Sequence, residues 1–410
     1  MKSASAIGLL RDRGFRHLWL AVILSFLGHF VHVIACAWVM TDLTHSATMV
    51  ALIQTAASLP MALLSLVSGG LADVFDRRRV MFAAEIGMLG VSLLLVAFSA
   101  AGAHSPTSLL VLIFMVSLGS TVLVPSWQVS LGDLVEVEAL PEAISLHTVG
   151  ANIIKTIGPF VGGLVLASFG ATLTFAFSTL GYIPALIALA RWRRPSTASG
   201  ARLFPAIAEG LTYFRRTPRL FPVVERIFLF GMCSIAVLSL LPLVARNHLG
   251  GDAGIYGLLF GGYGLGAILC GLAMRPLRRR FGIERVISAT IAINAVAVIA
   301  LGQSDQLGVA FLASTASGGG WLLVLTLLNS TLQLSSPRPL VGRMVSIFMT
   351  FTYVGIALGG WIWGSLAERI GTDTALMLAG MAMAAIVPFG WWRPLPDVST
   401  PERNVVPAEI

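Results

Sequence analysis

The chain has 410 residues, of which 56% are hydrophobic and only 11% are charged. Soluble domains carry about 25% charged residues, so this composition excludes a soluble enzyme or binding module and predicts an integral membrane protein. The net charge of +8 does not indicate a nucleic-acid partner, because the arginines lie in short clusters between apolar runs, as the positive-inside rule expects of cytoplasmic loops.

Apolar runs of about 20 residues, the length that crosses a bilayer as a helix, recur along the whole chain and favour helices over a barrel. Residues 1–17 are basic, and we expect a cytoplasmic N-terminal segment there. Residues 18–191 form a predicted six-helix bundle, with spans at 18–40, 47–72, 80–102, 107–131, 143–167 and 171–191. Residues 221–392 form a second bundle, with spans at 221–245, 254–275, 283–302, 307–333, 342–367 and 373–392.

Between the bundles, residues 192–220 form the only long connection. It is basic, and its apolar residues have helical spacing, which predicts an amphipathic cytoplasmic linker helix on the inner leaflet. Residues 393–410 hold four prolines and are predicted to be a loose cytoplasmic tail. Twelve spans place both termini on the cytoplasmic side. The predicted fold is therefore all-α, with two pseudo-symmetric bundles of six transmembrane helices.

The two bundles repeat one pattern at an offset of 201 residues. The arginine triplet 77–79 is matched by the triplet 278–280 at this offset. So are the pairs Gly119 and Gly320, Ser145 and Ser346, Gly158 and Gly359, Gly163 and Gly364, and Gly170 and Gly371. Agreement at separate places without a gap indicates two copies of a unit of roughly 200 residues.

Two such halves joined by a basic linker resemble the major facilitator superfamily. Its loop signature, G-x-x-x-D-(R/K)-x-G-(R/K)-(R/K), is matched by Gly69, Asp73, Arg77 and Arg78, although Val74 and Asp76 depart from it. The resemblance implies a conformational latch in which Asp73 contacts the start of the eleventh span near Arg343 and holds the outward-open state. The alternative is that Asp73 is an interfacial carboxylate solvated among arginines.

In the fifth predicted span, Gly158, Pro159, Gly162 and Gly163 resemble the core of the family's exporter signature, G-P-x-x-G-G. More closely, segments 14–19, 125–128 and 209–213 resemble the bacterial enterobactin-exporter-like branch, which implies efflux across the cytoplasmic (inner) membrane. That branch usually has an aspartate where this chain has His29. The glycines and Pro159, with Gly359 and Gly360 in the equivalent span, are predicted to be close helix contacts that serve as hinges.

Ionisable groups at mid-depth in a membrane are functional candidates. His29 and His32 share one helical face, and histidine exchanges protons near neutral pH, so we predict a proton site there. Packing histidines are the alternative. Lys155, also central, attracts an anionic substrate or loses its proton, unless it extends between helices to the cytoplasmic side. Glu85 completes the proton-coupling candidates, although its place within two turns of a cytoplasmic end predicts access to water.

An aromatic, weakly polar substrate pocket is predicted from Phe30, Gln54, Trp321 and Asn329, because the helix of Trp321 lines the cavity in the family that the chain resembles. The three cysteines lie inside apolar runs, so neither a disulfide framework nor a metal site is expected. No cofactor is predicted.

The function that the sequence favours is proton-coupled efflux of a small amphiphilic or aromatic compound, such as a siderophore, natural product or drug, by alternating access. A facilitative or uptake carrier of the same fold is the alternative. A non-transporting receptor is less favoured, and an enzyme is disfavoured because no nucleophile with a base, paired carboxylates, phosphate loop or metal set is evident. The expected partners are the substrate, protons and the lipid bilayer, and the expected state is a monomer.

Overall fold

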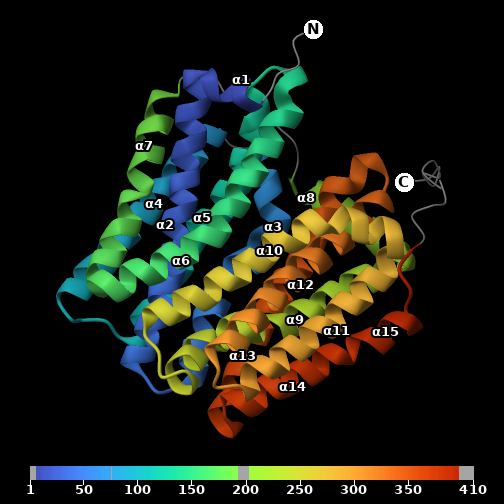
Figure 1. Cartoon of the computed structure of the whole chain (residues 1–410). Coiled ribbons are helices and arrows are strands. Elements are labelled where there is room, and N and C mark those ends of the chain that lie inside the picture. The colour runs from blue at the N-terminus through green and yellow to red at the C-terminus, as the bar shows by residue number, and fades with distance from the viewer. Residues whose placement is uncertain (1–5, 75, 193–202, 397–410) are drawn as a thin grey trace. The chain divides into compact units, whose positions relative to one another are not determined.

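The computed structural model describes residues 6–74, 76–192 and 203–396, and the regular structure within these ranges is helical (Figure 1). From the N-terminus, the long helices are α2 (Arg13–Leu43), α3 (Ala47–Val74), α4 (Arg77–Ala100), α5 (Pro106–Leu134), α6 (Leu140–Leu180) and α7 (Tyr182–Arg191). After α8 (Leu203–Arg216) follow α9 (Phe221–Leu243), α10 (Ala253–Phe281), α11 (Ile283–Gln303), α12 (Leu307–Leu334), α13 (Val341–Ile370), α14 (Thr372–Ala384) and α15 (Ile386–Trp392). The short elements are α1 (Ala6–Arg11), η1 (Val137–Ala139), η2 (Pro218–Leu220), the π-helical turn η3 (Val244–His248) and η4 (Arg338–Leu340).

The protein is a multi-pass membrane protein, because the described part of the chain contains 11 helices that are long and apolar enough to cross a bilayer. One of them, Leu140–Arg191, runs for 52 residues, about 78 Å at 1.5 Å per residue, which is far longer than a single crossing of about 30 Å. Gly170 interrupts it with φ 76° and ψ 175°, where the fifth and sixth predicted spans meet. The count of twelve crossings itself stays a prediction.

Gly371 repeats this geometry in the second half of the chain. It lies between α13 and α14 with φ 89° and ψ 154°, 201 residues after Gly170. A positive φ of this size strains any residue with a Cβ, so both positions need glycine. The offset found in the sequence therefore corresponds to one backbone feature that occurs twice.

Contacts divide the chain into two units. Unit 1 comprises residues 1–45, 67–201 and 251–261, and unit 2 comprises residues 46–66, 202–250 and 262–410. In unit 1, α2 packs on α6 and α7, and α4 packs on α5, around a core that includes Phe15, Met81, Trp127 and Tyr182. In unit 2, α9 packs on α13, and α11 packs on α12 and α14. The first part of α3 thus belongs to unit 2, and the first part of α10 belongs to unit 1.

The linker forms α8, whose last turn carries Arg215 and Arg216. It rests on α13 in unit 2, where Gly210 lies against the stem of Arg343 and the Arg343 guanidinium pairs with Glu209 at 2.7 Å. Phe214 packs against Phe221 with ring centroids 5.0 Å apart. One face of α8 is therefore apolar and buried, while its last turn is basic.

Candidate functional site

Glu85 lies in the interior of unit 1. Its side chain is 0% exposed, and neither carboxylate oxygen has a hydrogen-bond partner among the described residues. The Ser25 hydroxyl of α2 and the Tyr182 phenol of α7 lie close enough to interact with it electrostatically. The expectation that Glu85 reaches water is therefore wrong, because α2 and α7 cover this face of α4.

His32 belongs to the same interior. It is 0% exposed, and its Nε2 lies 3.2 Å from the Ser92 hydroxyl, which in turn contacts the Thr179 hydroxyl. The His32 ring lies 5.5 Å from that of Phe175 and 6.2 Å from that of Tyr182. We call Glu85, Tyr182, His32, Ser92 and Thr179 the polar cluster, which joins α2, α4, α6 and α7.

His29 lies one turn earlier on α2. It is partly buried, its Nδ1 has no partner among the described residues, and its ring meets the edge of Phe30 at 5.8 Å. The two histidines are three residues apart and therefore lie on one face of α2. Of the four proton-coupling candidates, the structure thus places Glu85 and His32 on either side of Tyr182, with His29 one turn from His32.

Lys155, the fourth candidate, lies apart from this cluster. Its side chain is exposed on α6, and its neighbour in electrostatic reach is His147. His147 is buried and accepts a hydrogen bond from the Trp127 indole at 3.0 Å. The role of Lys155 therefore stays a prediction, separate from that of His29 and His32.

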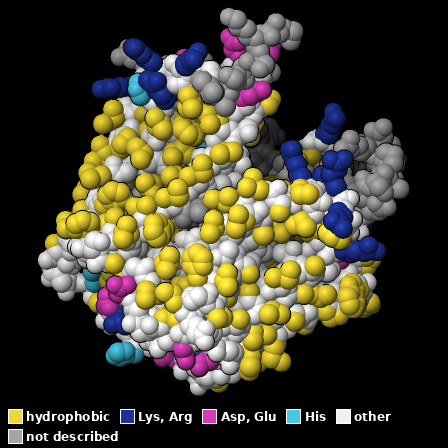
Figure 2. Space-filling view, in the orientation of Figure 1, with side chains coloured by type: hydrophobic (Ala, Val, Ile, Leu, Met, Phe, Trp, Pro, Cys, Tyr) yellow, Lys and Arg dark blue, Asp and Glu magenta, His cyan; other side chains and the backbone are white. Residues whose placement is uncertain are grey.

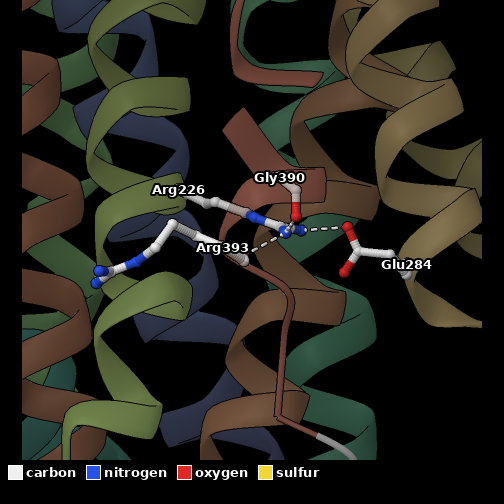
Figure 3. A network of polar contacts seen from close by, with 4 residues as sticks. All are labelled: Arg226, Glu284, Gly390 and Arg393. Atoms are coloured by element: carbon white, nitrogen blue, oxygen red, sulfur yellow. Dashed lines mark hydrogen bonds and ion pairs between the residues drawn. The ribbon is translucent and has the colours of Figure 1, made fainter. Parts of the chain in front are cut away.

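Unit 2 contains an ion pair centred on a buried arginine (Figure 3). Arg226, which follows Ser25 by 201 residues, is 1% exposed and contacts Glu284 of α11 at 2.6 Å. It also donates to the carbonyls of Gly390 and Arg393 at the end of α15. Glu85 has no such arginine beside it, because the position equivalent to Arg226 in unit 1 is Ser25.

The signature residues organise the helix ends of unit 1. Asp76, where the signature has glycine, caps α4 by accepting from the Arg79 amide at 3.2 Å. Arg77 pairs with Asp133 of α5 at 2.8 Å. Arg78 donates to the carbonyls of Leu189 and Ala190, a favourable place for a cation at a helix C-terminus.

The predicted latch partners are described only in part. The side chains at positions 69 and 73 lie outside the described residues, so the contact of Asp73 stays a prediction. Arg343, its expected partner, pairs with Glu209 of the linker helix α8.

The hinge glycines fall into matched sets. Gly158 and Gly162 lie against Phe30 and Val31 of α2, and Pro159 between them is buried. Gly359 lies in the same way against Met232 of α9. A Cβ added to any of these three glycines would lie within 3.2 Å of an atom of the neighbouring helix.

The second set contacts the first parts of α3 and α10, the two segments that belong to the unit of the other repeat. A Cβ on Gly163 would lie 2.4 Å from the Cα of Gly257 in α10, and one on Gly364 would lie 2.4 Å from the Cβ of Ala51 in α3. Gly360 lies against Thr55, whose hydroxyl donates to the Ala357 carbonyl at 2.9 Å. Equivalent glycines of the two repeats therefore hold equivalent helix contacts, which supports the predicted structural role.

The pocket candidates are distributed over both units. In unit 2, Trp321 stacks on Phe230 at 6.0 Å, Asn329 accepts from Gln333 at 2.5 Å, and Gln54 is buried with an unpartnered side-chain nitrogen. Phe30 belongs to unit 1, where it packs on Gly158. Their convergence on one substrate stays a prediction.

Sequence reasoning missed Tyr182, Ser92 and Thr179, which have no pattern that separates them from other residues of an apolar run. It also missed Arg226, for which a signal was present: an arginine six residues inside the seventh span needs a buried partner. Within the ranges that the structure describes, no group of three or more histidine, cysteine or acidic side chains has the arrangement of a metal site.

Comparison with known proteins agrees with this architecture. A nucleoside transporter superposes with a TM-score of 0.75 at 13% identity, covering 92% of this chain and 99% of that one. A D-xylose-proton symporter superposes with a TM-score of 0.71 at 12% identity, covering 94% and 98%. At these identities, the likeness shows a shared fold.

Sequence relatives are transporters. An uncharacterized MFS-type transporter of Bacillus subtilis is 24% identical, with 92% of each chain covered. The enterobactin exporter of Escherichia coli is 26% identical over 91% of this chain and 89% of its own. A staphyloferrin A transporter of Staphylococcus aureus is 24% identical over 63% of this chain and 66% of its own.

The family profile described as transmembrane secretion effector matches residues 4–407. This match covers nearly the whole chain, with both repeats and the linker between them. The chain therefore belongs to the transmembrane secretion effector family of major facilitator superfamily transporters.

Proposed function

We propose that this transporter exports a small amphiphilic or aromatic compound in exchange for protons, with Glu85 as the proton carrier. The export direction is supported by the secretion family and by the likeness to an enterobactin exporter. We further propose that the protein works as a monomer in a bacterial inner membrane, with both termini cytoplasmic.

The observation that carries the proton step is the uncompensated burial of Glu85. An ionised carboxylate without a counter-ion is strongly disfavoured in an apolar interior, so the closed cluster holds the acid in its neutral form. Opening the cluster to water allows the proton to leave. Whether Glu85 carries its proton therefore depends on how closely α7 packs against α4.

The rest of the polar cluster supplies a route for that proton. The Tyr182 hydroxyl has no partner among the described residues, and the Tyr182 ring lies beside His32, which contacts Ser92. Hydroxyl and imidazole groups both donate and accept hydrogen bonds, so they can pass a proton along a chain. His32 is the relay in this proposal, and His29 tunes it by charge repulsion.

Transport in everted membrane vesicles tests the proposal. With an imposed inside-acid gradient, a panel of catecholate siderophores and lipophilic drugs is added, and a pH-sensitive dye reports the gradient. Wild type should lose the gradient in response to a substrate. Glu85→Gln, which keeps the size but cannot ionise, should abolish that response.

Two further variants make the assay specific. Glu136→Gln removes an exposed acid of the same unit and should behave like wild type. His32→Gln should slow proton movement at least tenfold if the histidine is a relay. Substrate accumulation that persists in Glu85→Gln with an unchanged proton response would refute the proton role, and accumulation without any proton movement would identify a facilitative carrier.

A further inference from the structure

A cavity of about 700 Å³ opens in unit 1, away from the polar cluster. It lies between the start of α2 and the end of α7, with Leu134 of α5 at its edge. Its volume falls within the roughly 300–1,000 Å³ of ordinary ligand sites. None of the residues to which we assign proton transfer lines it.

The polar groups of this cavity are mainly donors. Arg191 is exposed at the rim, and no described residue forms an ion pair with it. The Trp192 indole N–H is buried without an acceptor among the described residues. Asp12, the one carboxylate, caps α2 by accepting from the Phe15 amide at 2.7 Å, so the positive end of the helix dipole partly offsets its charge. The cavity therefore suits a ligand that is rich in acceptors and negatively charged.

The remaining wall is apolar. Leu20, Leu24 and Ile187 line it and are 43%, 40% and 48% exposed. Leu24 follows His17, another lining residue, by seven residues, so it lies about 10 Å further along the helix at 1.5 Å per residue. The donors thus lie at the helix ends, and the apolar wall extends toward the middle of the span, which is the orientation of a lipid in a bilayer.

This end of unit 1 is basic. Arg78 at the start of α4 donates to the last carbonyls of α7, and Arg13 and Arg16 lie in the first turn of α2. Figure 2 shows dark blue side chains gathered at the end of this unit, with a mainly yellow flank below them. Basic pockets at membrane-facing helix ends attract anionic lipid headgroups.

We propose that this cavity binds an anionic phospholipid, with the phosphate on Arg191 and the Trp192 N–H and one acyl chain along Leu20, Leu24 and Ile187. The lipid fastens α7 to α2, the two helices whose packing encloses Glu85. It is thus a structural ligand of unit 1 rather than a transported molecule.

Native mass spectrometry of the full chain in mild detergent tests this site, with phosphatidylglycerol and phosphatidylcholine as probes. Wild type should retain one phosphatidylglycerol more tightly than phosphatidylcholine. Arg191→Gln should weaken phosphatidylglycerol binding about fivefold, from about 1 kcal/mol per basic residue near a membrane surface. Adding Trp192→Phe should weaken it further.

Arg13→Gln is the matched control, since Arg13 is exposed on the same basic end but does not line the cavity. It should change binding less than twofold. A photoactivatable phosphatidylglycerol should label peptides that contain Leu24 or Ile187. Equal losses in Arg13→Gln and Arg191→Gln, or labelling spread evenly over the lipid-facing helices, would overturn the proposal.

Discussion

The ion pair of unit 2 gives the sharpest stability prediction. Arg226→Met keeps the apolar stem but removes the guanidinium, which contacts Glu284 and the carbonyls of Gly390 and Arg393 (Figure 3). Removing one partner of a buried pair costs about 3–5 kcal/mol. The Glu284 side chain is 38% exposed, so water partly solvates the orphaned charge, and the lower end of that range, about 3 kcal/mol, is expected.

Thermal unfolding in detergent measures this loss. For a unit of this size, each kcal/mol shifts Tm by about 2–4 °C, so Arg226→Met should lower Tm by roughly 6–12 °C. Arg226→Lys keeps the charge, but an ammonium group cannot reach the carboxylate and both carbonyls as a planar guanidinium does. Its Tm should therefore lie between those of wild type and Arg226→Met.

A double variant isolates the orphaned charge. Arg226→Met with Glu284→Gln removes both charges and should recover about half of the loss, leaving the two α15 carbonyls without their donor. If Arg226→Met melts within about 2 °C of wild type, less than the shift expected for 1 kcal/mol, apolar packing replaces the pair and the reasoning fails. If the double variant is no better than the single one, the carbonyl contacts carry the whole effect.

Three other changes test features of both units. Gly163→Ala places a Cβ 2.4 Å from Gly257 and should destabilise by about 1–3 kcal/mol in thermal unfolding, whereas Gly132→Ala, with nothing within 4 Å, should not. Glu368→Gln replaces the charged acceptor of the Ser46 hydroxyl and the Thr48 amide by a neutral one. The start of α3 should lose about 1 kcal/mol, so hydrogen exchange of the Thr48 amide should accelerate about fivefold. Burial lowers the pKa of His104, which touches Phe98 and Phe175. Its stabilising contribution is full above the unfolded pKa of about 6.5 and declines as pH falls below that value. His104→Gln should therefore flatten the acid side of a plot of Tm against pH.

Much of the architecture is present in the sequence as repetition. Gly170 and Gly371 stand at one offset and share one left-handed backbone conformation, because a sharp break between two spans demands glycine wherever it occurs. The match of Gly158 with Gly359, and of Gly163 with Gly364, likewise corresponds to equivalent close contacts in the two repeats. Such positions are predictable because the constraint acts on the residue itself.

The polar cluster was harder to predict, because its chemistry arises from packing. Distance from the end of the span suggested that Glu85 reaches water, yet the neighbouring helices α2 and α7 close over it. No local pattern identifies Tyr182 or Thr179 as its surroundings. Which face of α4 is covered depends on residues about 60 and 100 positions away, and a single sequence does not report that pairing.

The exchange of helix segments between units has a consequence for how such a chain arose. Gly163 needs α10, and Gly364 needs α3, so each unit is completed by residues that the other repeat encodes. A product of one repeat alone would have lacked that complement and would have required a second copy of itself. Two copies in one chain supply both complements at once, which is what a duplicated and fused gene would encode.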